Sequence, residues 1–288
     1  MTPAMGADDG PWAALAQSLL QEAKAGRPVY PALARLSPGL KKQIDSDSHF
    51  QDFKNLWGQS LNFDEHAQAT IVETPLIEAI SQAMAVAAPK GHVVHAGTEH
   101  TYGYLLSLLK TPYGYKRARW VENEIEIGFG LPIETFNPNT KEGTLFSNVT
   151  FFMGNIAFRS HPGHLRTLRA NQSHVPDFLP NFQYSKLEIS RIEETAGKIK
   201  LWTDLVPFTG PTARNGDSYL LIYSIQERLQ DAPKLITAFP IQKSFAQNLM
   251  DKKNMVNQIP ITTRYNGYIQ GLSGKTVLGS RKLIAPAH

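Results

Sequence analysis

The segment from Gly91 to Trp120 carries the side chains best suited to chemistry. It combines histidines, a glutamate and a following basic group: His92, His95, Glu99, His100, Lys116, Arg117 and Arg119. Imidazole titrates near neutral pH, and a neighbouring carboxylate can orient it for proton transfer. Guanidinium and ammonium groups pair with anions. The segment therefore has the residue types needed to bind an anion or to move a proton.

An acid–base site is the interpretation that this spacing favours. We expect a helix over about residues 99–109 with Thr98 as its cap. The first turn of a helix has free N–H groups and the positive end of the dipole, which favour an anion. In this hypothesis His95 is the acid or base, Glu99 orients it, and His100 is a second proton-transfer group.

The residues that follow are expected to hold the substrate. Lys116, Arg117 and Arg119 would bind its negative charge. Tyr113 and Tyr115 flank a glycine in a turn and would line the rim of the pocket. A small anionic molecule is therefore the expected partner.

Two other interpretations of the same residues stay open. Glu99 can simply complement the helix dipole, with His95 as a hydrogen-bonded core residue. A metal site is less favoured, because the pattern H-x-x-H-x-x-x-E-H differs from H-E-x-x-H and H-x-x-E-H. On a strand, His92 and His95 would also point to opposite faces. We therefore expect neither a metal nor another cofactor.

The run Lys-Leu-Ile-Thr-Ala-Phe-Pro at residues 234–240 resembles the final strand of EndoU-type ribonucleases. That family implies two histidines and a lysine in one site, and His95, His100 and Lys116 are residues of these types. The resemblance covers this run alone, and the family's surrounding sequence is absent. It implies metal-independent transesterification of RNA, with histidines as acid and base. A nucleic-acid partner is the alternative that follows from it.

Composition narrows the classes of function. The chain has 288 residues and no cysteine, which excludes disulfides, thiolate catalysis and iron–sulfur clusters. Its formal net charge is only +4, whereas nucleic-acid binders usually carry a denser basic stripe. The N-terminus has no signal-peptide pattern, and no stretch reaches the roughly 18 apolar residues that span a bilayer. We expect a cytoplasmic protein without a membrane partner, and nothing indicates its oligomeric state.

The pattern of apolar residues predicts an α+β fold. Residues 1 to about 90 read as helices, and residues from about 91 to 288 as mainly β structure. Strands are expected at 125–131, 149–153, 156–158, 187–189, 199–203, 219–225, 235–241, 262–269 and 276–284, with a helix at 244–254. A regular βαβ alternation is absent. We therefore predict one domain over 1–288, with N-terminal helices packed on a large, mainly antiparallel, curved sheet.

Three classes of function follow from these patterns. The first is an enzyme, a lyase or hydrolase, that acts on a small anionic substrate by metal-free His/Glu chemistry. The second is a ribonuclease, which requires a continuous basic groove. The third is a non-catalytic ligand-binding or assembly protein, which requires a broad exposed apolar patch and no converging titratable groups.

Overall fold

The computed structural model describes residues 10–64, 67–111, 114–196, 198–208, 218–228, 231–251, 259–261 and 277–284. Its N-terminal part contains the helices α1 (Pro11–Lys24), α2 (Val29–Leu36), α3 (Pro38–Asp47), α4 (Gln51–Asn55) and α5 (Thr74–Ala83). Proline occupies the first turn of α1, α3 and α5, where its missing N–H would have no helical partner in any case. The helical character expected for this part of the chain is confirmed.

Two short strands precede the segment that contains Glu99 and His100. β1 (Gln59–Leu61) and β2 (Val93–His95) pair antiparallel, with Ser60 opposite Val94. β2 leads directly into α6 (Ala96–Thr98), which continues as the π-helix η1 (Glu99–Gly103). β3 (Lys110–Thr111) and β4 (Gly114–Tyr115) form a second small antiparallel pair.

The main sheet has six strands in the order β8-β7-β6-β5-β10-β9. Their bounds are β5 (Ser190–Ala196), β6 (Ile199–Phe208), β7 (Ser218–Gln226), β8 (Lys234–Gln242), β9 (Ile259–Ile261) and β10 (Val277–Ile284). Every neighbouring pair is antiparallel, which confirms the predicted type of sheet. The predicted strands at 219–225, 235–241 and 276–284 are confirmed as β7, β8 and β10. The one at 262–269 lies outside the described residues.

The expected strands between residues 125 and 158 are wrong. The chain forms α7 (Ala118–Val121), α8 (Glu124–Phe129), α9 (Leu145–Ala157) and α10 (Pro162–Ala170) there. All residues of α9 except Asn155 are buried. Its sequence therefore lacks the polar face that marks an amphipathic helix. Gly154, between the expected strands 149–153 and 156–158, lets α10 approach α9, since a Cβ there would lie 3.0 Å from Leu168.

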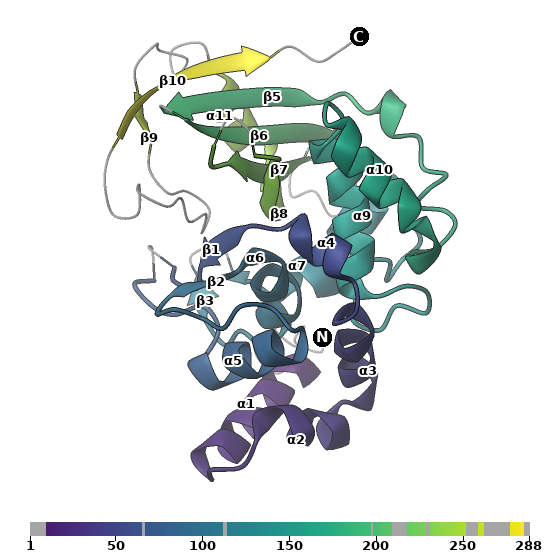
Figure 1. Cartoon of the computed structure of the whole chain (residues 1–288), viewed down its shortest axis with the longest axis vertical. Helices are drawn as coiled ribbons and strands as arrows, with labels where there is room; N and C mark the ends of the chain where they lie inside the picture. Colours follow the sequence, from purple (N-terminus) through teal and green to yellow (C-terminus); the bar gives the residue numbers. More distant parts are fainter. Residues whose placement is uncertain are drawn as a thin grey trace, which may run out of the picture.

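Helices cover both faces of the sheet (Figure 1). α6 and α9 contact β8, and α9 also contacts β7. On the opposite face, α11 (Lys243–Met250) contacts β7 and β8, which confirms the predicted C-terminal helix. α1 and α2 lie at the end of the molecule away from the sheet, where they pack on α5 (Figure 1). The N-terminal helices thus reach the sheet mainly through α6 and α9.

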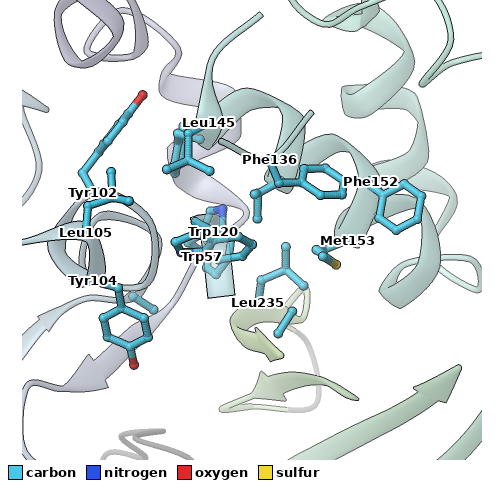
Figure 2. Close-up of a cluster of buried hydrophobic side chains, with 14 of the residues drawn as sticks. Trp57, Tyr102, Tyr104, Leu105, Trp120, Phe136, Leu145, Phe152, Met153 and Leu235 are labelled. Carbon is cyan, nitrogen blue, oxygen red and sulfur yellow. The ribbon is translucent and has the colours of Figure 1, made fainter. Parts of the chain in front are cut away.

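One apolar cluster joins these layers, from Leu19 in α1 to Ala238 in β8. Figure 2 shows its centre, with Trp57 and Trp120 between the tyrosines of the α6–η1 segment and the phenylalanines near α9. The hydroxyl groups of Tyr102 and Tyr104 point in opposite directions from this core (Figure 2). The π-helix therefore has polar groups on two sides, and Tyr104 lies on the side of His100.

Candidate functional site

His95 is the N-terminal cap of α6, so the predicted role of Thr98 as the cap is wrong. The Nδ1 atom of His95 accepts a hydrogen bond from the backbone N–H of Thr98 at 3.2 Å. Its Nε2 atom lies 3.1 Å from the backbone carbonyl oxygen of Lys54, to which it donates. Burial lowers the pKa of His95 to about 4. Both ring nitrogens therefore have structural partners, and the neutral ring is fixed in place.

His100 has a different environment. Its Nδ1 atom lies 2.9 Å from the Oε2 atom of Glu99 and 2.9 Å from the carbonyl oxygen of Ala96. Both of these neighbours are acceptors, so Nδ1 carries a hydrogen and Nε2 of the neutral ring presents a lone pair. Ser60 in β1 donates to the same Oε2 atom at 2.6 Å. The sequence thus creates a carboxylate–imidazole pair from adjacent residues of a π-helix.

Two polar atoms of this pair have no hydrogen-bond partner among the described residues. They are the Oε1 atom of Glu99 and the Nε2 atom of His100. The two residues are 0% and 1% exposed, respectively. A buried polar atom without a partner costs about 1–3 kcal/mol, so two of them on one contacting pair of side chains call for an explanation. π-Helical turns are themselves frequent at functional sites.

Arg119 lies beside this pair on the aromatic ring of Tyr104. Its guanidinium carbon is 4.9 Å from the centre of that ring and 5.0 Å from the ring of Phe239 in β8. Its Nη1 atom donates to the Oγ1 atom of Thr237 at 3.1 Å. Burial lowers the pKa of Arg119, while the charge of Glu99 and a hydrogen bond with Tyr104 oppose this change. The guanidinium group is therefore held between the π-helix and the sheet.

Lys116 is the second cation that lies on the ring of Tyr104. Its Nζ atom lies 5.9 Å from the ring centre of Tyr104 and 3.2 Å from the Oδ2 atom of Asp64. Burial is the main cause that lowers the pKa of Lys116, and the charge of Arg119 adds to it. The negative charges of Asp64 and Glu99 act in the opposite direction. Lys116 and Arg119 thus share one environment with the Glu99–His100 pair.

The remaining predicted binding residues have other contacts. Arg117 is buried, donates to the carbonyl oxygen of Ser107 at 2.6 Å, and stacks on the ring of Tyr115 at 4.3 Å. Lys110 lies over the same ring at 5.7 Å. These contacts fix the β3–β4 segment rather than pointing to the carboxylate–imidazole pair. Tyr113 lies outside the described residues.

Several residues of the site were not in the predicted set: Ser60, Asp64, Tyr104 and Thr237. Tyr104 could have been found, because it is four residues after His100 and helical neighbours at this spacing meet; the two rings are 4.7 Å apart. Ser60 and Thr237 come from distant strands, and no local pattern marks them. Packing of β1 and β8 against the π-helix brings them there.

His100 also contacts the apolar core through its backbone and its ring. The indole Nε1 of Trp120 donates to the backbone carbonyl oxygen of His100 at 2.7 Å. His100 also contacts Tyr104 through its ring, so its orientation is fixed from two sides. In the part of the chain that the structure describes, no three histidine or carboxylate side chains are placed to hold a metal ion.

Comparison with known proteins adds no relative. No family model matches the chain, and no curated protein or solved structure matches it. Across the described ranges, no helix combines the length and apolar character needed to cross a membrane. The function therefore has to be argued from the geometry of the site.

Proposed function

We propose that this protein is an enzyme that acts on a small acidic substrate by general acid–base catalysis. His100 is the proton-transferring residue, and Glu99 orients its ring. Arg119 and Lys116 bind the acidic group of the substrate. Relative to the sequence hypothesis, the proton-transferring role moves from His95 to His100, because both nitrogens of His95 already have protein partners.

The observation that carries this proposal is the fixed His100 ring with a free nitrogen. The Nδ1 side is held by Glu99 and Ala96, each at 2.9 Å, while Nε2 has no partner among the described residues. A carboxylate in this position favours the tautomer in which Nε2 is the base, and it stabilises the imidazolium that forms after proton transfer. A purely structural histidine, such as His95, has no need of a free nitrogen.

The proton step can be written with these residues alone. The Nε2 atom of His100 takes a proton from the bound substrate, and the bonding electron pair remains on the substrate atom. The carboxylate of Glu99, whose Oε2 atom lies 2.9 Å from Nδ1, stabilises the positive charge of the new imidazolium, while Nδ1 donates to the carbonyl oxygen of Ala96. The negative charge on the substrate lies near Arg119 and Lys116, which stabilise it electrostatically.

Binding of simple anions tests the role of the two cations. Isothermal titration of the full chain with acetate and with formate should show binding that Arg119→Gln weakens at least about tenfold, because a charge-assisted pair is lost. Arg169→Gln is the matched control, since Arg169 is exposed in the last turn of α10. Equal affinity of wild type and Arg119→Gln for both anions would contradict the proposal.

The state of the His100 ring tests the role of the base. Nitrogen NMR of the wild-type protein should show the neutral ring protonated at Nδ1 and unprotonated at Nε2. Adding a bound anion should shift the Nε2 signal and leave the signals of His95 unchanged. A neutral ring protonated at Nε2 would rule out His100 as a base oriented by Glu99.

A further inference from the structure

We infer that the substrate carries a hydrogen-bond donor, a hydroxyl or an ammonium group, next to a carboxylate. This inference rests on the proposed function and deepens it by naming the substrate class. The class is that of small 2-hydroxy acids and 2-amino acids. Three properties of the site lead to it: the kind of atoms left without partners, the contact between the groups that carry them, and the balance of charge.

Both partnerless atoms are acceptors. The Oε1 atom of ionised Glu99 can only accept a hydrogen bond, and the hydrogen of the His100 ring is committed at Nδ1. A plain carboxylate or phosphate dianion offers further acceptors and would leave both atoms unsatisfied. An ammonium group can donate to both atoms, and a hydroxyl group can donate to one of them.

The two partnerless atoms belong to groups that are in direct contact. Oε1 and Oε2 belong to the same carboxylate of Glu99, Nδ1 and Nε2 belong to the same ring of His100, and the Oε2–Nδ1 separation is 2.9 Å. The two cations lie on the ring of Tyr104, with Nζ of Lys116 at 5.9 Å and the guanidinium carbon of Arg119 at 4.9 Å from its centre. The centre of this ring is 4.7 Å from that of the His100 ring.

The charges of the site are already balanced. Lys116 and Arg119 contribute two positive charges, and Asp64 and Glu99 contribute two negative charges. Asp64 is paired with Lys116 at 3.2 Å, which leaves Arg119 as the main cation for a substrate. A dianion would add negative charge close to Glu99 and be repelled. A monocarboxylate with its own donor fits this balance, because the donor faces the Glu99–His100 pair and the carboxylate faces Arg119.

The same donor supplies the proton in the first chemical step. The O–H or N–H bond of the substrate breaks, the hydrogen binds to Nε2 of His100, and the electron pair stays on the oxygen or nitrogen. No oxidant or other reactant is consumed in this step. The donor therefore serves both for recognition and for activation of the substrate.

Three carboxylates of matched size test the inference: acetate, glycolate and glycine. Titrated into the full wild-type chain, glycolate or glycine should bind at least about tenfold more tightly than acetate, which is the gain expected from one hydrogen bond to a charged group. The better of the two identifies the donor as hydroxyl or ammonium. Glu99→Gln should reduce the preference to about twofold or less and keep the weak binding of acetate. Glu78→Gln, on the exposed face of α5, should leave the preference unchanged.

The outcomes distinguish the inference about the substrate from the proposed function on which it rests. Equal binding of the three compounds in wild type, weakened by Arg119→Gln, would overturn the donor inference and leave the proposed function intact. Absence of any Arg119-dependent binding would overturn both. The comparison within the wild-type protein does not depend on whether the Glu99 variant folds.

Discussion

Arg191 and Asp204 lie directly opposite each other on β5 and β6, and their side chains form a two-pronged ion pair. The Nε and Nη2 atoms of Arg191 donate to the two carboxylate oxygens at 2.8 and 2.7 Å. Arg159, at the end of α9, donates to the same carboxylate at 2.9 Å. A single buried carboxylate therefore joins two strands of the sheet to the helix that covers it.

Asp204→Asn should destabilise the protein strongly. The substitution leaves Arg191, whose side chain is 6% exposed, as a buried charge without its counter-ion. Breaking a buried ion pair in this way costs about 3–5 kcal/mol. Urea denaturation of wild type and variant measures the difference in the free energy of unfolding.

Arg159→Gln is the control for this prediction. Its side chain is 30% exposed, so water can compensate for much of what is lost. We expect a loss below about 1 kcal/mol. If both variants lost similar free energy of unfolding, the buried Arg191–Asp204 pair would contribute no more to stability than the partly exposed Arg159–Asp204 pair.

Gly97→Ala should destabilise the protein through the core beneath the site. A Cβ atom at Gly97 would lie 2.7 Å from Cγ of Trp57 and 2.8 Å from Cε2 of Phe146. Overpacking of this kind typically costs about 1–3 kcal/mol. Gly39→Ala, in α3, is the matched control, because no atom lies within 4 Å of a Cβ there. Denaturant unfolding should show a loss for position 97 and a gain of up to about 1 kcal/mol for position 39. A neutral effect at position 97 would mean that the two aromatic rings move apart easily.

Local patterns predicted the helices and hairpins where one face of each element is buried. The strand pairs β5–β6 and β7–β8 alternate between the two sides of the sheet, with Leu220 and Ile222 in one apolar cluster and Leu221 and Tyr223 in the other. Because both faces of β7 are buried, its sequence is a short continuous apolar run between polar segments, which also indicates a strand. α9 has no such signal, because it is buried on all sides and its composition resembles that of a buried strand.

The candidate site was predictable only in part, for a related reason. Glu99 and His100 are adjacent, so their combination is visible in the sequence. The difference between His95 and His100 is not, since it depends on which carbonyl oxygens and side chains surround each ring. His95 meets the carbonyl oxygen of Lys54 only after α4 and β2 have packed together. Tertiary contacts thus decide which histidine keeps a free nitrogen.

Asp47→Asn should change how stability depends on pH. Burial raises the pKa of Asp47 to about 6, above its ordinary value of 3.8, although Tyr102, Thr144 and Ser147 donate to it. The folded state therefore binds more protons than the unfolded state between about pH 4 and pH 6. Stability from this group is fully present below about pH 4 and is lost as the pH rises through 6. The full change is roughly 3 kcal/mol, which follows from the size of the shift.

The measurement is urea unfolding at several pH values between 4 and 7. In Asp47→Asn the downward contribution of this group should disappear, so the free energy of unfolding should rise with pH across this window more steeply than in the wild type. Asparagine can still accept hydrogen bonds from Thr144 and Ser147, so the surroundings of the site are kept. A variant with the same pH profile as wild type would show that Asp47 is ionised at the same pH in the folded and unfolded states.

His95→Asn should have the opposite effect on the pH profile. Burial lowers the pKa of His95 to about 4, below its ordinary value of 6.5, so the unfolded state binds more protons between these values. Its contribution to stability is present above about pH 6.5 and is lost as the pH falls through 4. Asparagine is a good helix cap and can accept from the N–H of Thr98, so α6 should still form.

In the wild-type protein the contributions of Asp47 and His95 oppose each other between about pH 4 and pH 6, and their slopes largely cancel. His95→Asn should therefore expose the slope of Asp47, with stability that falls as the pH rises, whereas Asp47→Asn should expose the slope of His95. The double variant should have a nearly flat profile in this window, and unfolding curves of all four proteins measure it. A double variant with the same profile as Asp47→Asn would mean that His95 titrates at the same pH in the folded and unfolded states. Because His95 would then take up a proton near neutral pH, its Nδ1 atom would lose the lone pair that caps α6, so this result would also contradict the bonding on which His95 is assigned a structural role.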